Sequence, residues 1–175
     1  MLQFSKVLKF ILLLIFFYGC KKQVEVSPVP TLTYIGIDQL KDIFGKDSSG
    51  VLRLQFTDGD GDMGLSPSDT FPPFNYGSKF YFNFFINYFE KQNGEWVKIV
   101  LPPIEPGGDT LTNNSRIPDL TPVGQNKVLQ GDLIFELFTN NPFSPYDTIK
   151  YEVTIVDRAL NRSNMVSTQE IVLVK

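Results

Sequence analysis

The stretch Phe80–Leu101 reads FYFNFFINYFEKQNGEWVKIVL and predicts a β-hairpin. In its first half, large apolar side chains occupy every second position: Phe80, Phe82, Phe84, Ile86 and Tyr88. A period of two is typical of a strand with one buried face. Asn93-Gly94 predicts the turn, because both residues tolerate a positive φ, and Trp96–Leu101 predicts the return strand. The hairpin therefore makes this a β protein before any other segment is considered.

The same alternation predicts strands on both sides of the hairpin. They are expected at 32–37, 51–56, 133–137, 151–155 and 171–174. One short helix is expected where Asp38, a good N-cap, precedes apolar residues at helical spacing. Residues 102–127, rich in Pro and Gly, predict a long loop ordered over the sheet. About seven strands with almost no helix favour an all-β sandwich.

Composition narrows the chemistry of the chain. It has 175 residues, 16 Phe and 7 Tyr, but no His and one Cys. The lack of His removes Ser-His-Asp and Cys-His catalysis, and a Ser nucleophile would need a lysine base that no Ser-x-x-Lys motif supplies. Any metal site must use oxygen ligands, which favours hard cations such as calcium. A net charge of −3 with no basic stripe argues against nucleic-acid binding.

The first 19 residues, MLQFSKVLKFILLLIFFYG, have the pattern of a secretory signal peptide. Two lysines precede an apolar run that is shorter than the roughly 20 residues of a spanning helix. The following Phe17-Tyr18-Gly19-Cys20 resembles a bacterial lipobox, although Phe17 replaces the usual Leu. That resemblance implies lipidation of Cys20 and a membrane anchor. The alternative is an ordinary cysteine in an uncleaved anchor.

Three regions follow from this pattern. Residues 1–19 are expected to be the signal peptide, 20–31 the lipidated N-terminus with a flexible tether, and 32–175 one β-sandwich domain. Within that domain, Tyr151–Asn161 (YEVTIVDRALN) resembles the penultimate strand and following turn of immunoglobulin-like and fibronectin type III domains. The resemblance implies an immunoglobulin-like antiparallel sandwich in which Tyr151 packs at a sheet corner.

One loop carries most of the recognisable chemistry. Residues 56–64 read FTDGDGDMG, so Asp58, Asp60 and Asp62 alternate with glycines directly after a strand. Three carboxylates this close repel one another unless a cation lies between them. The spacing resembles the first part of an EF-hand loop, in which Asp69 would be the twelfth position, although Met63 stands where that motif has Gly. The sequence therefore predicts a calcium site, with a solvated, metal-free turn as the alternative.

Strand order adds a fifth candidate ligand. If 51–56 and 151–156 are the second and sixth strands of a sandwich, their trailing loops lie at the same pole. Asp157 would then approach the aspartates after Phe56 and complete the cation shell. Alternatively, Arg158 would neutralise the acidic loop directly.

A second candidate site is aromatic. Tyr81, Phe85 and Phe89 share the face of the central strand opposite the core. Exposed rings there would stack on a sugar or dock a protein. The competing interpretation is that a neighbouring loop, such as 102–127, covers them.

Taken together, the lipobox, the FTDGDGDMG loop, Arg116-Ile117-Pro118 and the DRALNRSN turn resemble uncharacterised lipoproteins of Bacteroidota. The resemblance implies a lipid anchor in the outer membrane, facing the periplasm or the cell surface, and supplies no activity. We expect a non-catalytic binding or structural module of the envelope, stabilised by calcium. The alternatives are a glycan-binding accessory lipoprotein of a polysaccharide-uptake system and a small hydrolase. An envelope protein is a further expected partner.

Overall fold

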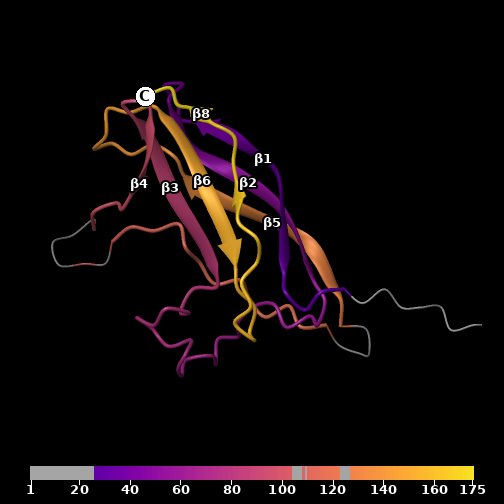
Figure 1. Cartoon of the computed structure of the whole chain (residues 1–175). Helices are drawn as coiled ribbons and strands as arrows, with labels where there is room; N and C mark the ends of the chain where they lie inside the picture. Colours follow the sequence, from indigo (N-terminus) through magenta and orange to yellow (C-terminus); the bar gives the residue numbers. More distant parts are fainter. Residues whose placement is uncertain (1–25, 104–107, 109, 123–126) are drawn as a thin grey trace, which may run out of the picture.

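The computed structural model describes residues 26–103, 108, 110–122 and 127–175, which form a two-layer β structure (Figure 1). Its strands are β1 (Thr31–Lys41), β2 (Asp47–Asp58), β3 (Phe84–Gln92), β4 (Glu95–Ile99), β5 (Leu129–Phe138), β6 (Thr148–Ile155), β7 (Val166–Ser167) and β8 (Ile171–Val172). One antiparallel sheet has the order β1-β2-β5. The other has β4-β3-β6-β7, and β8 also pairs with β6. The predicted all-β sandwich is confirmed.

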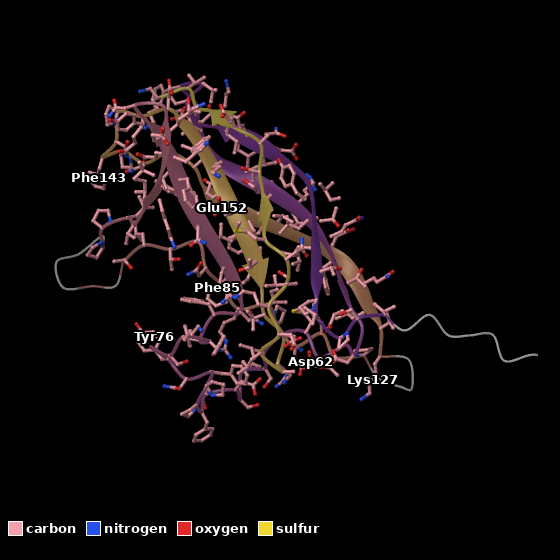
Figure 2. All side chains as sticks on the ribbon, in the orientation of Figure 1. Asp62, Tyr76, Phe85, Lys127, Phe143 and Glu152 are labelled. Atoms are coloured by element: carbon pink, nitrogen blue, oxygen red, sulfur yellow. The ribbon has the colours of Figure 1, made fainter. Side chains whose placement is uncertain are left out.

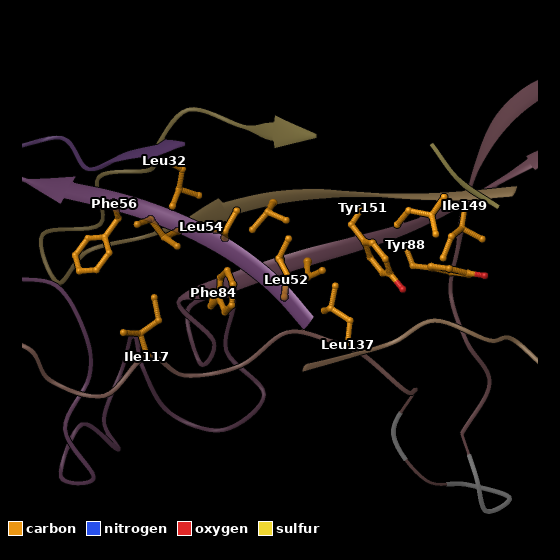
Figure 3. Packing of buried hydrophobic residues seen from close by; sticks show 14 of the residues in the cluster. Leu32, Leu52, Leu54, Phe56, Phe84, Tyr88, Ile117, Leu137, Ile149 and Tyr151 are labelled. Carbon is orange, nitrogen blue, oxygen red and sulfur yellow. The ribbon is translucent and has the colours of Figure 1, made fainter. Parts of the chain in front are cut away.

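The core lies between the sheets and is built from the alternating positions that the sequence predicts (Figure 3). Leu52 and Leu54 of β2 face Phe84 of β3 across the interior, and all three side chains are buried. Phe84 also packs edge-to-face on Phe135 of the opposite sheet, at 5.3 Å between ring centroids. Each large side chain contributes roughly 1.5–3 kcal/mol by leaving water. This packing fixes β2, the strand that leads into the loop of Asp58, Asp60 and Asp62.

Tyr151 ties the two sheets together at one end. Its ring is fully buried on β6, and its hydroxyl donates a hydrogen bond of 2.6 Å to the Phe138 carbonyl at the end of β5. Burial raises the pKa of Tyr151, so the hydroxyl stays protonated and acts as a donor. The first residue of the Tyr-x-Val-x-Ile pattern thus places a tyrosine between the two layers.

The short helix expected after Asp38 is wrong. β1 continues to Lys41, and Asp38 instead pairs with Arg53 of the neighbouring strand at 2.9 Å. Asp42 closes the following turn, because its carboxylate accepts from the backbone amides of Phe44 and Lys46. The cross-strand ion pair and the hairpin ladder therefore prevail over the helical spacing.

The central strand is shorter than its sequence pattern predicts. β3 begins at Phe84, because Asn83 turns inward and exchanges two hydrogen bonds with the backbone of Ile117. Two further differences are small: β2 begins at Asp47, ahead of the predicted strand 51–56, and the two-residue β7 was not predicted.

The signal peptide, Cys20 and the first part of the tether lie outside the described residues. Within the part of the chain that is described, no helix is long and apolar enough to cross a bilayer.

Candidate metal site

The acidic loop lies at the end of the sandwich where the described chain begins (Figure 2). β2 delivers Asp58 there, and β6 delivers Asp157 two residues after its last residue, Ile155. The two loops touch directly, since the Ala159 amide donates 2.9 Å to the Asp62 carboxylate. Because β2 and β6 run toward the same pole, the predicted approach of Asp157 to the aspartate loop is confirmed.

Four carboxylates converge at this contact. Asp58, Asp60, Asp62 and Asp157 each offer an oxygen, and these oxygens all lie within 4.8 Å of one another. Asp58 and Asp157 are almost fully buried, at 0% and 1% exposed. Among the described residues, no Lys or Arg forms an ion pair with any of the four. The cluster could therefore hold a metal ion.

The hydrogen bonds of the cluster leave a set of oxygens without donors. Asn161 donates from its backbone and its side chain to both oxygens of Asp157, at 2.7 and 2.9 Å. By contrast, both oxygens of Asp58 and one oxygen each of Asp60 and Asp62 are buried and have no hydrogen-bond partner. A buried carboxylate without donors is costly, so these oxygens are the ones that a cation would satisfy.

Electrostatics within the cluster disfavour ionisation. Burial, then the negative charges of Asp60 and Asp62, raise the pKa of Asp58 to about 7. The pKa of Asp62 and that of Asp157 are also raised, in each case first by burial and then by neighbouring carboxylates, despite the backbone and Asn161 donors that lower them. A divalent cation reverses this logic, because it favours the charged form of every carboxylate around it.

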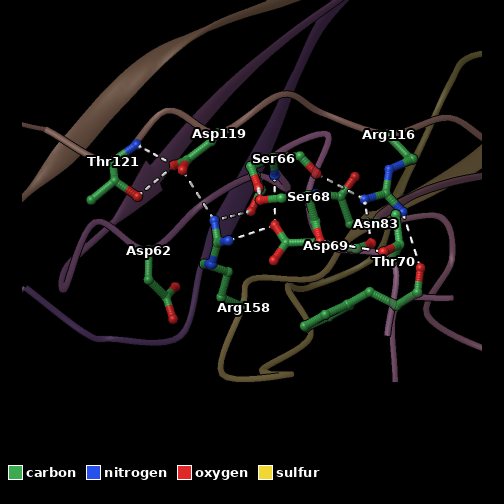
Figure 4. A network of polar contacts seen from close by, with 12 residues as sticks. Asp62, Ser66, Ser68, Asp69, Thr70, Asn83, Arg116, Asp119, Thr121 and Arg158 are labelled. Carbon is green, nitrogen blue, oxygen red and sulfur yellow. Dashed lines mark hydrogen bonds and ion pairs between the residues drawn. The ribbon is translucent and has the colours of Figure 1, made fainter. Parts of the chain in front are cut away.

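Asp69, predicted as a ligand by counting from Asp58, is not in the cluster. Its carboxylate accepts from the Ser66 amide and pairs with Arg158 (Figure 4). Burial would raise the pKa of Asp69, but the Ser66 and Arg158 hydrogen bonds hold it below its usual value. The prediction was wrong because it assumed EF-hand geometry, whereas the loop here follows a strand.

Arg158 is occupied elsewhere and does not neutralise the acidic loop. Its second guanidinium nitrogen pairs with Asp119 at 3.2 Å, so the side chain lies between Asp69 and Asp119 (Figure 4). Its only hydrogen bond with the loop's aspartates is from its backbone amide to the Asp62 carbonyl, at 3.3 Å. The alternative in which Arg158 replaces a cation is therefore wrong.

Arg116 organises residues 66–81, the segment that follows the acidic loop, a role that the sequence does not predict. Its guanidinium donates to four backbone carbonyls of that segment: Ser66, Asp69, Phe74 and Tyr81. Residues 66–81 lie outside the named strands, so Arg116 supplies four of their long-range hydrogen bonds, and the pairing of Arg158 with Asp69 adds another. No local pattern around Arg116 reveals contacts 35 to 50 positions away.

The glycines of the loop permit close backbone contacts. A Cβ on Gly59 would lie 2.3 Å from the Val26 carbonyl, and one on Gly61 would lie 1.9 Å from the Lys127 carbonyl. The Gly59 amide donates 3.0 Å to the Ser27 carbonyl, which fixes the start of the described chain against the loop. The backbone of residues 26, 27 and 127 therefore packs directly against the acidic loop. These contacts hold the loop in place before any cation binds.

The three aromatic candidates do not form a free platform. All are partly buried, and each carries a cation over its ring: Arg116 over Tyr81, Arg162 over Phe85 and Lys150 over Phe89, at 4.7 to 5.2 Å from the centroids. Phe85 and Phe89 face outward from β3, whereas Tyr81 precedes that strand. The structure therefore does not join the three rings into one stacking surface.

Comparisons with protein-family models, with curated proteins and with solved structures found no match to this chain. Fold and site geometry therefore carry the functional argument.

Proposed function

We propose that this protein is a lipid-anchored, non-catalytic module of the bacterial cell envelope whose β-sandwich binds calcium between its β2 and β6 loops. The main support for a bound cation is the environment of Asp58. Its side chain is fully buried inside a four-carboxylate cluster, and neither of its oxygens has a hydrogen-bond donor. Without a cation, this arrangement concentrates negative charge where water cannot screen it.

Calcium fits the ligand set better than the other common cations. The ligands are oxygens alone, which excludes the nitrogen and sulfur donors that zinc prefers. Two oxygens on opposite sides of a calcium ion are roughly 4.6–5.2 Å apart, against about 4.1 Å for magnesium. The four oxygens lie within 4.8 Å of one another, a span that a calcium shell covers and that is wider than a magnesium shell needs. Magnesium remains the comparison in the test.

The test is thermal unfolding of the purified protein in calcium, in magnesium and in chelator. Calcium at about 100 times its Kd stabilises by about 2.7 kcal/mol, which for a domain of this size raises the melting temperature by roughly 5–10 °C. Asp60→Ala should abolish the shift, because it removes one ligand from the cluster.

Asp132→Ala is the matched control for this experiment. Asp132 is an exposed carboxylate near the same end of the sandwich and outside the cluster, so its loss should leave the calcium shift intact. Superimposable melting curves in calcium and in chelator would remove the cation from the proposal.

The anchor is supported by the lipobox-like sequence before Cys20. Two or more acyl chains hold a protein firmly to a bilayer, at about 0.8 kcal/mol per buried methylene. In bacterial cells the protein should partition into the detergent phase of Triton X-114, with diacylglyceryl mass on Cys20. Cys20→Ser should prevent lipidation. Unmodified Cys20 in the mature wild-type protein would contradict the anchor while leaving the calcium test unaffected.

A further inference from the structure

A pocket of about 450 Å³ lies where the edge of the five-stranded sheet divides. β4 pairs with only one half of β3, from Tyr88 to Gln92. Beyond that point the chain leaves β4 and returns, so that Ser115 bridges to Phe84 on the edge of β3. The gap between β4 and the returning segment 110–114 is the pocket, and the 76–82 segment closes its third side.

Two polar side chains of the pocket, Asn113 and Asn114, are held in fixed orientations by backbone hydrogen bonds. The side-chain carbonyl of Asn114 accepts 2.8 Å from the Ile86 amide, and that of Asn113 accepts 3.3 Å from the Phe138 amide. Since these oxygens are held by backbone N–H groups, each side chain's NH2 group is its remaining polar end. In the described part of the chain, neither of these NH2 groups has an acceptor. The side-chain amide of Asn87, which also lines the pocket, has no hydrogen-bond partner among the described residues.

The rest of the lining is mostly aromatic and aliphatic, and it is nearly uncharged. Tyr76 and Tyr81 meet edge-to-face at 5.2 Å, and Tyr76 is 69% exposed. Lys98 is the one charged residue among the described residues that line the pocket. The aromatic surface and oriented amides therefore occur together without a cluster of cations.

We propose that this pocket binds a short oligosaccharide. Sugar hydroxyls are acceptors that match the fixed N–H donors, and the apolar face of a pyranose ring packs on tyrosine. An acyl chain would leave the donors unpaired, and a phosphate-bearing ligand would favour more than one cation in the lining. This saccharide site goes beyond the proposed calcium binding. No residue of the calcium cluster lines this pocket.

The fixed orientation of these donors also lowers the entropic cost of binding. The Asn113 and Asn114 side chains are already held by backbone hydrogen bonds, so little rotamer freedom is lost when a sugar binds. A pocket of 450 Å³ is in the range of small-ligand sites. A pocket of this size accommodates a few sugar units, and the rest of a longer oligosaccharide would extend into solvent.

The experiment is calorimetric titration of the calcium-loaded full-length protein with maltotetraose, chitotetraose and tetragalacturonate. These probes present neutral, N-acetylated and acidic sugars, so the pattern identifies the saccharide class. At least one should bind, and Tyr76→Ala and Asn87→Ala should each weaken it at least about tenfold. Phe71→Ala is the matched control, because Phe71 is a similarly exposed aromatic residue five positions before Tyr76 and does not line the pocket.

Two results would overturn the saccharide site: no binding of any of the three probes at about 10 mM, or equal loss of binding in the control variant. Melting curves of every variant in calcium accompany the titration. A variant that keeps its calcium shift has an intact fold and cation site, so the failure of the saccharide site and the failure of the calcium proposal give different results.

Discussion

Asp58→Asn should change stability in opposite directions with and without calcium. In chelator at about pH 8, wild-type Asp58 is ionised although its pKa in the fold is about 7 rather than 3.8. Raising the pKa of Asp58 by about 3 corresponds to roughly 4 kcal/mol of destabilisation of the folded state when the carboxylate is ionised. The substitution removes this destabilisation, but the new Asn amide is buried without hydrogen-bond partners, which lowers the free energy of unfolding by about 2 kcal/mol. The cation-free variant should therefore melt about 4–8 °C above the cation-free wild type.

With calcium at about 1,000 times the wild-type Kd, the order reverses. The wild type gains about 4.1 kcal/mol from binding, whereas the variant has lost one charged ligand and gains much less. Differential scanning calorimetry in calcium and in chelator measures both differences. If Asp58→Asn destabilises the protein equally in the two buffers, Asp58 is an ordinary structural carboxylate and the reasoning about repulsion fails.

Three other predictions follow from the same structure. In chelator, the raised pKa values of Asp58, Asp62 and Asp157 mean that the folded state holds extra protons, so the melting temperature should fall between about pH 5 and about pH 8. The calcium shift should grow over the same range, because protons compete with the cation; a pH-independent shift would exclude this linkage. Glu90 is buried and accepts from the side chains of Tyr88, Gln92, Asn141 and Ser144. Glu90→Gln should therefore cost at least about 2 kcal/mol in urea unfolding, and an unchanged midpoint would show that those bonds contribute nothing. Gly61→Ala should destabilise far more than Gly77→Ala. Both glycines have a positive φ, but only at Gly61 would the new methyl meet a carbonyl. Similar losses in the two variants would mean that backbone strain, rather than the contact with Lys127, decides the cost.

The strands were predictable where burial enforces alternation. Leu52, Leu54, Tyr151 and Val153 all sit at predicted inward positions, because a one-residue slip would expose a whole face. Prediction failed where a single long-range contact replaces the local pattern. Asn83 delays the start of the central strand to Phe84, because its side chain forms hydrogen bonds with the backbone of Ile117, 34 positions away.

The candidate site shows the same division. Asp157 could be predicted to join the aspartate loop because it depends only on strand order and direction. Asp69 could not be placed by counting, because its position depends on Arg158, which reaches it from the loop after β6. The oriented amides of Asn113 and Asn114 had no sequence signature, since backbone amides of distant residues orient them.

The hydrogen bond between Gly59 and Ser27 is the first described contact that tension on the preceding chain would load. β1 begins at the pole where this bond lies and runs antiparallel to β2, with partners from Thr31 to Lys41. Tension on the preceding chain is therefore directed along the strand, at right angles to its hydrogen bonds, so the bonds shear together rather than unzip one at a time. The first backbone to receive that pull is the acidic loop itself.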